Sequence, residues 1–139
     1  MEIKLLIMKL TIYTDGGARG NPGPAATGIV IKNSVGKILA AFGEYLGEQT
    51  NNYAEYMALI GGLKKAHAFG ATEVDCLLDS ELVVKQMRQE YKVKEPGLQK
   101  LFIIAYNSAI KFKKVNYRHI AREKNKEADK LVNETLDKR

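Results

Sequence analysis

Lys9-Leu10-Thr11-Ile12-Tyr13-Thr14-Asp15 runs directly into Gly16-Gly17-Ala18-Arg19-Gly20-Asn21-Pro22-Gly23-Pro24, and this stretch decides the fold. Polar and apolar residues alternate through its first part, which is typical of a strand with one buried face. The second part is rich in glycine and proline, and proline lacks the backbone donor that a sheet needs. We therefore expect a strand that ends at Asp15, followed by a turn-rich loop over residues 16–24.

Two more strands are expected immediately after this loop. Thr27–Lys32 and Lys37–Tyr45 are both rich in apolar and β-branched residues, and Asn33–Gly36 is a tight connection between them. Short connections between three consecutive strands favour an antiparallel meander.

The hydrophobic period then changes from that of a strand to that of a helix. Apolar and aromatic residues recur at intervals of three and four from about Asn52 to Phe69, which predicts an amphipathic helix. Thr50, Asn51 and Asn52 are all candidate N-caps for this helix, and Gly70 is a natural stop after it.

The rest of the chain alternates strands and helices. The expected elements are a buried strand over Val74–Leu78, a helix from Ser80 to Arg88, a helix from Pro96 to Lys111, a strand over Val115–Ile120 and a last helix from Asn125 to the terminus. The order is βββαβααβα. This order predicts an α/β fold, a five-stranded mixed sheet with helices packed on both faces.

The composition is that of an ordinary globular protein. A length of 139 residues suits one domain over residues 1–139, and 45% hydrophobic with 27% charged residues excludes a disordered tail. Cys76 alone cannot form an internal disulfide, and no apolar run could span a bilayer. Residues 1–7 do not resemble a signal peptide; they either extend the first strand or precede a natural start at Met8. We expect a soluble cytoplasmic protein.

Basic charge gathers at the C-terminal end of the chain. Residues 111–139 contain ten basic and five acidic residues, and this excess of +5 accounts for most of the net charge of +6. Such a distribution suggests a polyanionic partner, nucleic acid first. A solvated C-terminal helix gives the same pattern, and charge alone does not separate the two interpretations.

Four acidic residues fall where a site could form. Asp15 and Asp79 end strands, while Glu55 and Asp129 lie near helix starts, and ligands gather beyond strand ends where the strand order switches. Each acid taken singly has a structural explanation, as a cap or as a complement to the helix dipole. If they converge, however, unpaired carboxylates repel one another unless they are protonated or neutralised.

A hard divalent cation is the natural partner of such a cluster. Mg²⁺ is favoured over Zn²⁺, because one Cys and two separated His residues offer no zinc site. Two Mg²⁺ ions about 3.5–4 Å apart can support phosphodiester hydrolysis, which suits the basic tail. No P-loop or dinucleotide-binding fingerprint occurs. Cys76 lies in an apolar strand, so a Cys-His hydrolase is disfavoured.

Four motifs in order resemble type-one ribonuclease H over about residues 8–137. They are Thr14–Ala26 at the end of the first strand, Thr50–Glu55 at the helix start, Leu78–Val83 around an Asp-Ser pair, and Arg122–Leu131. The resemblance implies a ribonuclease H-like fold and an endonuclease that cuts the RNA strand of RNA–DNA hybrids. It further implies two Mg²⁺ ions, with Mn²⁺ as a substitute, and products with 5′-phosphate and 3′-hydroxyl ends.

The resemblance also assigns residues. It implies that Asp15, Glu55, Asp79 and Asp129 are the catalytic, metal-binding carboxylates and that Asn21, Thr50, Asn51 and Asn52 touch the nucleic acid. His119, ten residues before Asp129, matches an auxiliary catalytic histidine, although it alternates with Val115 and Tyr117 and could simply pack beside them. On physical grounds we add Gly16 and Gly17, which allow close approach of a ligand, and Arg122 and Lys124, which attract phosphate.

The chain departs from the family pattern in its connector over Gln89–Pro96. This connector carries only Lys92 and Lys94 where many members have a long basic protrusion, so the hybrid is expected to rely on the C-terminal basic residues. Glu81 stands where members often have Gln. Three alternatives remain: a related nuclease that acts on double-stranded RNA or on DNA strands, a noncatalytic hybrid-binding module, and a structural domain of a larger assembly. A phosphate binder gains nothing from four acids, so the enzyme is favoured. No obligatory protein partner is evident, and we expect a monomer.

Overall fold

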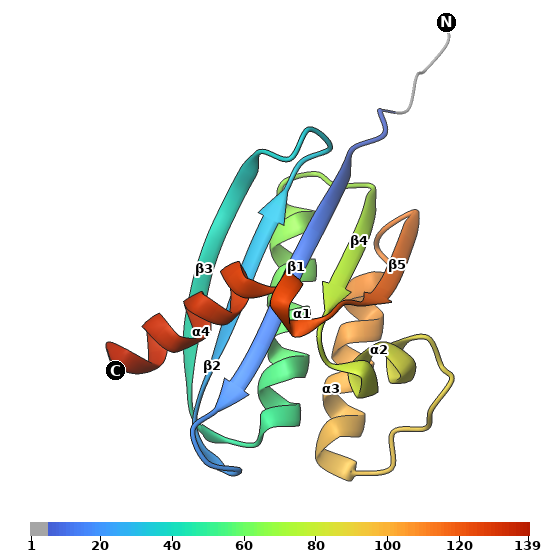
Figure 1. The fold of residues 1–139 in the computed structure, drawn as a ribbon. Helices are drawn as coiled ribbons and strands as arrows, with labels where there is room; N and C mark the ends of the chain where they lie inside the picture. Colours follow the sequence, from blue (N-terminus) through green and yellow to red (C-terminus); the bar gives the residue numbers. More distant parts are fainter. Residues whose placement is uncertain (1–5) are drawn as a thin grey trace, which may run out of the picture.

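The computed structural model describes residues 6–139, which form one five-stranded sheet with four α-helices (Figure 1). The elements are β1 (Lys9–Ala18), β2 (Gly23–Lys32), β3 (Ile38–Gln49), α1 (Asn51–Ala68), β4 (Glu73–Leu78), α2 (Glu81–Met87), α3 (Pro96–Ala109), β5 (Lys114–His119) and α4 (Lys126–Asp137), with a 3₁₀ turn at Arg122–Lys124. Leu6 and Ile7 are exposed and precede β1, and residues 1–5, on which part of the expected extension falls, lie outside the described residues. Within residues 6–139, no helix is both long and apolar enough to span a membrane.

The sheet has the order β3-β2-β1-β4-β5. The first three strands pair antiparallel, which confirms the expected meander. β4 pairs parallel with β1, and β5 pairs parallel with β4. The sheet is therefore mixed, as the element order predicted, and β1 lies at its centre.

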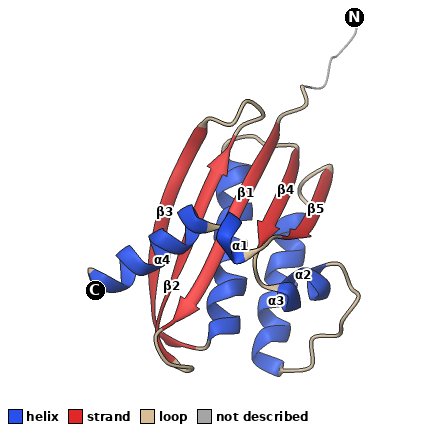
Figure 2. Cartoon of the chain, viewed as in Figure 1, coloured by secondary structure: helices blue, strands red, loops and turns tan. Residues whose placement is uncertain are grey.

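Helices cover both faces of the sheet, as predicted (Figure 2). α1 packs on one face, where a Cβ added to Gly62 would lie 2.6 Å from the Ile12 side chain. α4 crosses the other face so closely that a Cβ added to Gly28 would lie 2.0 Å from the Ala128 carbonyl oxygen. Successive residues of a strand point to opposite faces, so Ile29 faces α1 and Gly28 faces α4.

The main core lies under α1. Tyr56, Leu59 and Leu63 are fully buried, as are Leu10 and Ile12 of β1 opposite them. A smaller apolar cluster lies under α4 and consists of Ala26, Val132 and Leu136. The functional end of the sheet is therefore held between two packed layers.

The expected loop over residues 16–24 is mostly strand. β1 continues to Ala18 and β2 begins at Gly23, with Gly16 paired to Thr27 and Gly17 to Ala26. Gly16 allows β1 and α1 to pack closely, because a Cβ on it would lie 2.2 Å from the carbonyl carbon and oxygen of Ala54 in α1. Only the short segment around Gly20, whose φ is +97°, forms the turn.

Several element boundaries also differ from the sequence predictions. α1 begins at Asn51 because the Thr50 hydroxyl caps it, accepting from the Tyr53 backbone N–H at 3.1 Å. Glu55 consequently lies beyond the first turn. β3 continues to Gln49, four residues past its expected end, and α4 stops at Asp137 before the terminus. The cap of α2 at Ser80 is as predicted.

Candidate active site

Asp15 and Asp79 are brought together by the two central parallel strands. Thr14 of β1 pairs with Leu78 of β4, so the residues that follow them, Asp15 and Asp79, lie at the same level of the sheet. Asp15 is 6% exposed and Asp79 half-buried. The sequence placed both carboxylates at strand ends. Asp79 directly follows β4, whereas Asp15 lies within β1, which continues to Ala18, and the parallel register places the two side by side.

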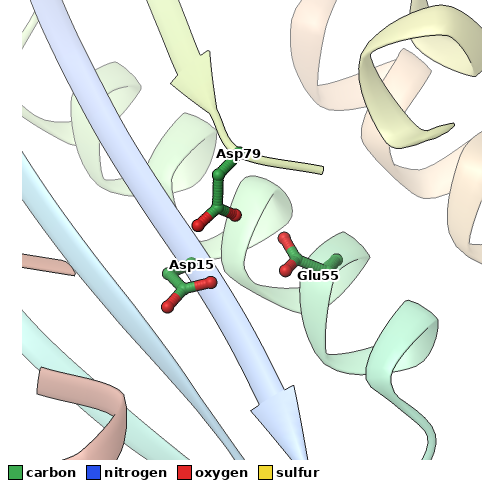
Figure 3. A group of neighbouring side chains, drawn as sticks. All are labelled: Asp15, Glu55 and Asp79. Carbon is green, nitrogen blue, oxygen red and sulfur yellow. The ribbon is translucent and has the colours of Figure 1, made fainter. Parts of the chain in front are cut away.

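Glu55 reaches the same place from α1. Because Gly16 has no side chain, the backbone of Ala54 and Glu55 lies directly against β1. Asp15, Glu55 and Asp79 each contribute one carboxylate oxygen to a group in which all three oxygens lie within 4.8 Å of one another. Figure 3 shows the three side chains converging from β1, α1 and the end of β4.

Asp129 approaches Asp15 from the opposite layer. It lies in the first turn of α4, and its carboxylate is close enough to accept a hydrogen bond from Asp15 when Asp15 is protonated. Arg122 reaches over it, with 3.8 Å between Nη2 and Asp129 Oδ1. All four predicted carboxylates therefore line one cavity of about 550 Å³.

The crowded acids perturb one another. Burial, together with the charges of Asp79 and Asp129, raises the pKa of Asp15 from 3.8 to about 7. Burial and the charge of Asp15 also raise the pKa of Glu55 well above its usual value. Burial raises the pKa of Asp79 as well, although Arg122 and the Asn125 side chain oppose the rise. Without a cation, the site thus holds protons at a pH where ordinary carboxyl groups have lost them.

The donor set fits a hard divalent cation. It consists of carboxylate oxygens, which Mg²⁺ and related ions prefer. Glu55 Oε2 is buried and has no hydrogen-bond partner among residues 6–139, and such an acceptor in a protein interior normally has one. An ion bound among Asp15, Glu55 and Asp79 would supply it.

The predicted nucleic-acid contacts surround this cavity unevenly. Gly16, Gly17, Asn51, Asn52 and Arg122 line it, whereas Asn21, Thr50 and Lys124 do not. Hydrogen bonds between the β1–β2 region and the start of α1 position several of these residues. Asn51 Oδ1 accepts from the Ala18 backbone N–H at 2.8 Å, and Asn21 Oδ1 accepts from the Asn51 backbone N–H at 3.0 Å. These bonds tie the β1–β2 turn to the start of α1.

His119 lies beside the cavity without lining it. It ends β5, is exposed and pairs in register with Leu78, the residue before Asp79. Val115 and Tyr117 of the same strand are partly buried against the core, whereas His119 itself is exposed. Its catalytic role stays a prediction.

Two polar residues at the site were missed by the sequence interpretation. Asn125 was assigned only as a helix start, yet it is buried beside Asp79. Arg19 was assigned to a loop, yet it lines the cavity and pairs with Asp137 at 2.7 Å. A polar residue just before a helix gives no signal that separates an inward-facing side chain from a cap, and a residue in a glycine-rich turn gives none of which way its side chain faces, so neither was recoverable from local pattern.

The strand order and the acids beside its two central parallel strands define the ribonuclease H-like class of α/β domains. Residues 13–135 match the family described as "Reverse transcriptase-like". The fold is similar to that of ribonuclease H1 from the archaeon Halobacterium salinarum, with a TM-score of 0.92 and 39% identity over 94% of this chain and 99% of that one. The chain belongs to the ribonuclease H family, type one.

Other relatives agree with this assignment. The N-terminal ribonuclease H domain of a Mycobacterium tuberculosis protein, solved as a fusion with maltose binding protein, has a TM-score of 0.92 and 45% identity, covering 94% of this chain and 95% of that one. LC11-RNase H1, solved in complex with an RNA/DNA hybrid, has a TM-score of 0.89 and 48% identity, covering 93% of this chain and 97% of that one. The chain spans 36% of the full mycobacterial protein, described as bifunctional, and 63% of the curated Halobacterium ribonuclease HI.

Proposed function

We propose that this protein is an endoribonuclease that hydrolyses the RNA strand of RNA–DNA hybrids with divalent cations, Mg²⁺ or Mn²⁺. The observation that carries the proposal is the convergence of Asp15, Glu55 and Asp79 within 4.8 Å in a cavity that Arg122 also lines. The relative crystallised with an RNA/DNA hybrid supports this choice of substrate.

The carboxylates would hold the cations. Asp15, Glu55 and Asp79 would hold one cation, and Asp129, which neighbours Asp15, would help to hold a second. Bound ions supply positive charge that stabilises the attacking and leaving oxygens of a phosphodiester. In-line attack by water at phosphorus would leave 5′-phosphate and 3′-hydroxyl ends.

The remaining residues would bind and orient the hybrid. Arg122 is 80% exposed at its side chain and beside the acids, so it can reach a phosphate next to the scissile bond. Gly16, Gly17, Asn51 and Asn52 line the wall of the cavity. Amide groups can donate to and accept from ribose 2′-hydroxyl groups without reading a base. This combination favours RNA as the cut strand over DNA.

The proposal is tested with three labelled duplexes of one sequence. An RNA–DNA hybrid, a double-stranded RNA and a DNA duplex are each incubated with Mg²⁺, Mn²⁺ or EDTA. We expect cleavage of the RNA strand of the hybrid only, with 3′-hydroxyl ends, and none in EDTA. Cleavage of double-stranded RNA would favour the related nuclease, and hybrid binding without cleavage would favour the binding module.

Matched variants connect the activity to the site. Asp79→Asn removes a charge from the cluster, whereas Asp75→Asn makes the same change four residues earlier, outside the cavity. We expect Asp79→Asn to abolish cleavage and Asp75→Asn to retain it. Turnover by Asp79→Asn at the wild-type rate would contradict the assigned site.

A further inference from the structure

Asn125 is a buried polar residue whose position has no ordinary explanation. Its exposed fraction is 1%, although asparagine is mostly found at protein surfaces. It precedes α4, where asparagine commonly caps the helix with its side chain. Here that cap is absent, and the side chain makes no hydrogen bond to the first turn of α4. The burial of this side chain must therefore serve another interaction.

The side chain instead points into the sheet. Asn125 Nδ2 donates to the backbone carbonyl of Thr14 at 2.8 Å, and the two residues are 111 positions apart in sequence. Thr14 is followed directly by Asp15. This bond therefore fastens the loop before α4 to the strand position that presents the central carboxylate.

Asn125 also reaches two more of the acids. Its side chain lies beside the Asp79 carboxylate at the end of β4. Its backbone carbonyl accepts from the Asp129 backbone N–H at 3.1 Å. One buried residue thus contacts Asp79, Asp129 and the neighbour of Asp15, which come from β4, α4 and β1.

The partners of this amide are chemically specific. The Thr14 carbonyl and the Asp79 carboxylate are both acceptors, and the Asn125 amide nitrogen carries two hydrogens, so it donates to the first and has a second hydrogen for the other. An Asp at this position would add a fifth carboxylate beside the four that line the cavity, and an apolar residue would remove the hydrogen bond that the Thr14 carbonyl accepts.

We propose that Asn125 is a positioning residue that fixes Asp15, Asp79 and Asp129 relative to one another and so sets the affinity of the site for divalent cations. The inference rests on the proposed metal site but not on the identity of the nucleic acid. Groups that orient metal ligands without binding the metal typically contribute 10–100-fold to affinity or activity. Asn125 acts through the carboxylates and touches no reacting atom.

Cation titration of the nucleic-acid-free protein tests this role. Mn²⁺ and Mg²⁺ binding is measured by calorimetry for the wild type, Asn125→Ala and Asn116→Ala, with unfolding measured in EDTA. Asn116→Ala is the matched control, because Asn116 Nδ2 donates to Asp75 Oδ1 at 2.9 Å away from the cavity. We expect both substitutions to lower the melting temperature of the protein. Only Asn125→Ala should weaken cation binding, by about 10–100-fold.

Kinetics on the hybrid give a second measure. We expect Asn125→Ala to lower kcat by a factor similar to its loss of cation affinity and to leave KM for the hybrid unchanged, because the phosphate-binding residues stay in place. Wild-type cation affinity in a destabilised Asn125→Ala variant would overturn the inference and leave a purely structural role. If the wild type cleaves no hybrid, the proposed function fails while the cation titration still decides the role of Asn125.

A measurement on the wild type covers the case in which Asn125→Ala does not fold. The side-chain amide protons of Asn125 should exchange with solvent far more slowly than those of the exposed Asn107, and their NMR signals should shift when Mg²⁺ is added. Exchange as fast as that of Asn107, or signals that do not respond to Mg²⁺, would overturn the inference.

Discussion

Replacing Asp15 by Asn should abolish cleavage and at the same time stabilise the metal-free protein. The substitution keeps the shape of the side chain and removes the charge that the site must hold. In the folded protein the pKa of Asp15 is raised from 3.8 to about 7, first by burial and then by the charges of Asp79 and Asp129. Between pH 3.8 and about pH 7 the folded state therefore binds more protons than the unfolded state. The free energy of unfolding consequently falls as the pH rises through this range.

The size of the effect follows from the shift. Because the unfolded chain ionises Asp15 at a lower pH than the folded protein does, the raised pKa lowers the free energy of unfolding by about 2 kcal/mol at pH 5 and about 4 kcal/mol at pH 7. Asn has no charge to bury, so Asp15→Asn should gain stability at pH 7, with about 4 kcal/mol as the ceiling, because the amide also loses hydration on burial. Its stability should also depend less on pH than that of the wild type, by about 2 kcal/mol between pH 5 and 7.

Denaturant unfolding in EDTA at pH 5 and pH 7 measures both quantities, and a hybrid cleavage assay in Mg²⁺ measures the loss of activity. Asp75→Asn is the matched control, and its expected change in stability has the opposite sign. Burial acts to raise the pKa of Asp75, but the hydrogen bond from Asn116 and the ion pair with Lys9 outweigh it and lower the pKa. Asp75→Asn should therefore lose stability at pH 7. The reasoning is refuted if Asp15→Asn is no more stable than the wild type at pH 7 and has the same pH dependence.

Three further predictions concern packing, binding and proton transfer. Gly16→Ala should lower the melting temperature and the activity together, since its Cβ would lie 2.2 Å from backbone atoms of α1. Gly97→Ala should be tolerated, because nothing lies within 4 Å of its Cβ, and equal melting temperatures of the two variants would contradict the packing argument. Hybrid affinity in Ca²⁺ should fall linearly with salt on logarithmic axes, and Lys124→Ala/Lys126→Ala should reduce that slope; an unchanged slope would move the contacts to Lys92 and Lys94. His119→Ala should lower kcat about tenfold or more with little change in KM, because proton transfer by a positioned group contributes 10²–10⁴-fold; a lower melting temperature with normal kcat would remove His119 from the reaction.

The sequence by itself determined the order of elements and the positions of the acids along them. The alternation over residues 9–15, the helical period after Thr50 and the glycine at position 70 are local signals, and the elements that they predicted are present. Hydrophobic period reports which face of an element is buried, and it does so without knowledge of the partner. The ordered motifs then identified the family, which the comparisons confirm.

The tertiary structure decided what the local pattern could not. Gly16 and Gly17 looked like a loop, but they continue β1, and α1 lies so close to the strand that a side chain at Gly16 has no room. Asn125 looked like a helix cap, but it turns inward to the Thr14 carbonyl. Both outcomes depend on segments more than 30 residues away in sequence. Close approach of backbones and the satisfaction of buried polar groups are properties of the assembled layers, so no local pattern records them.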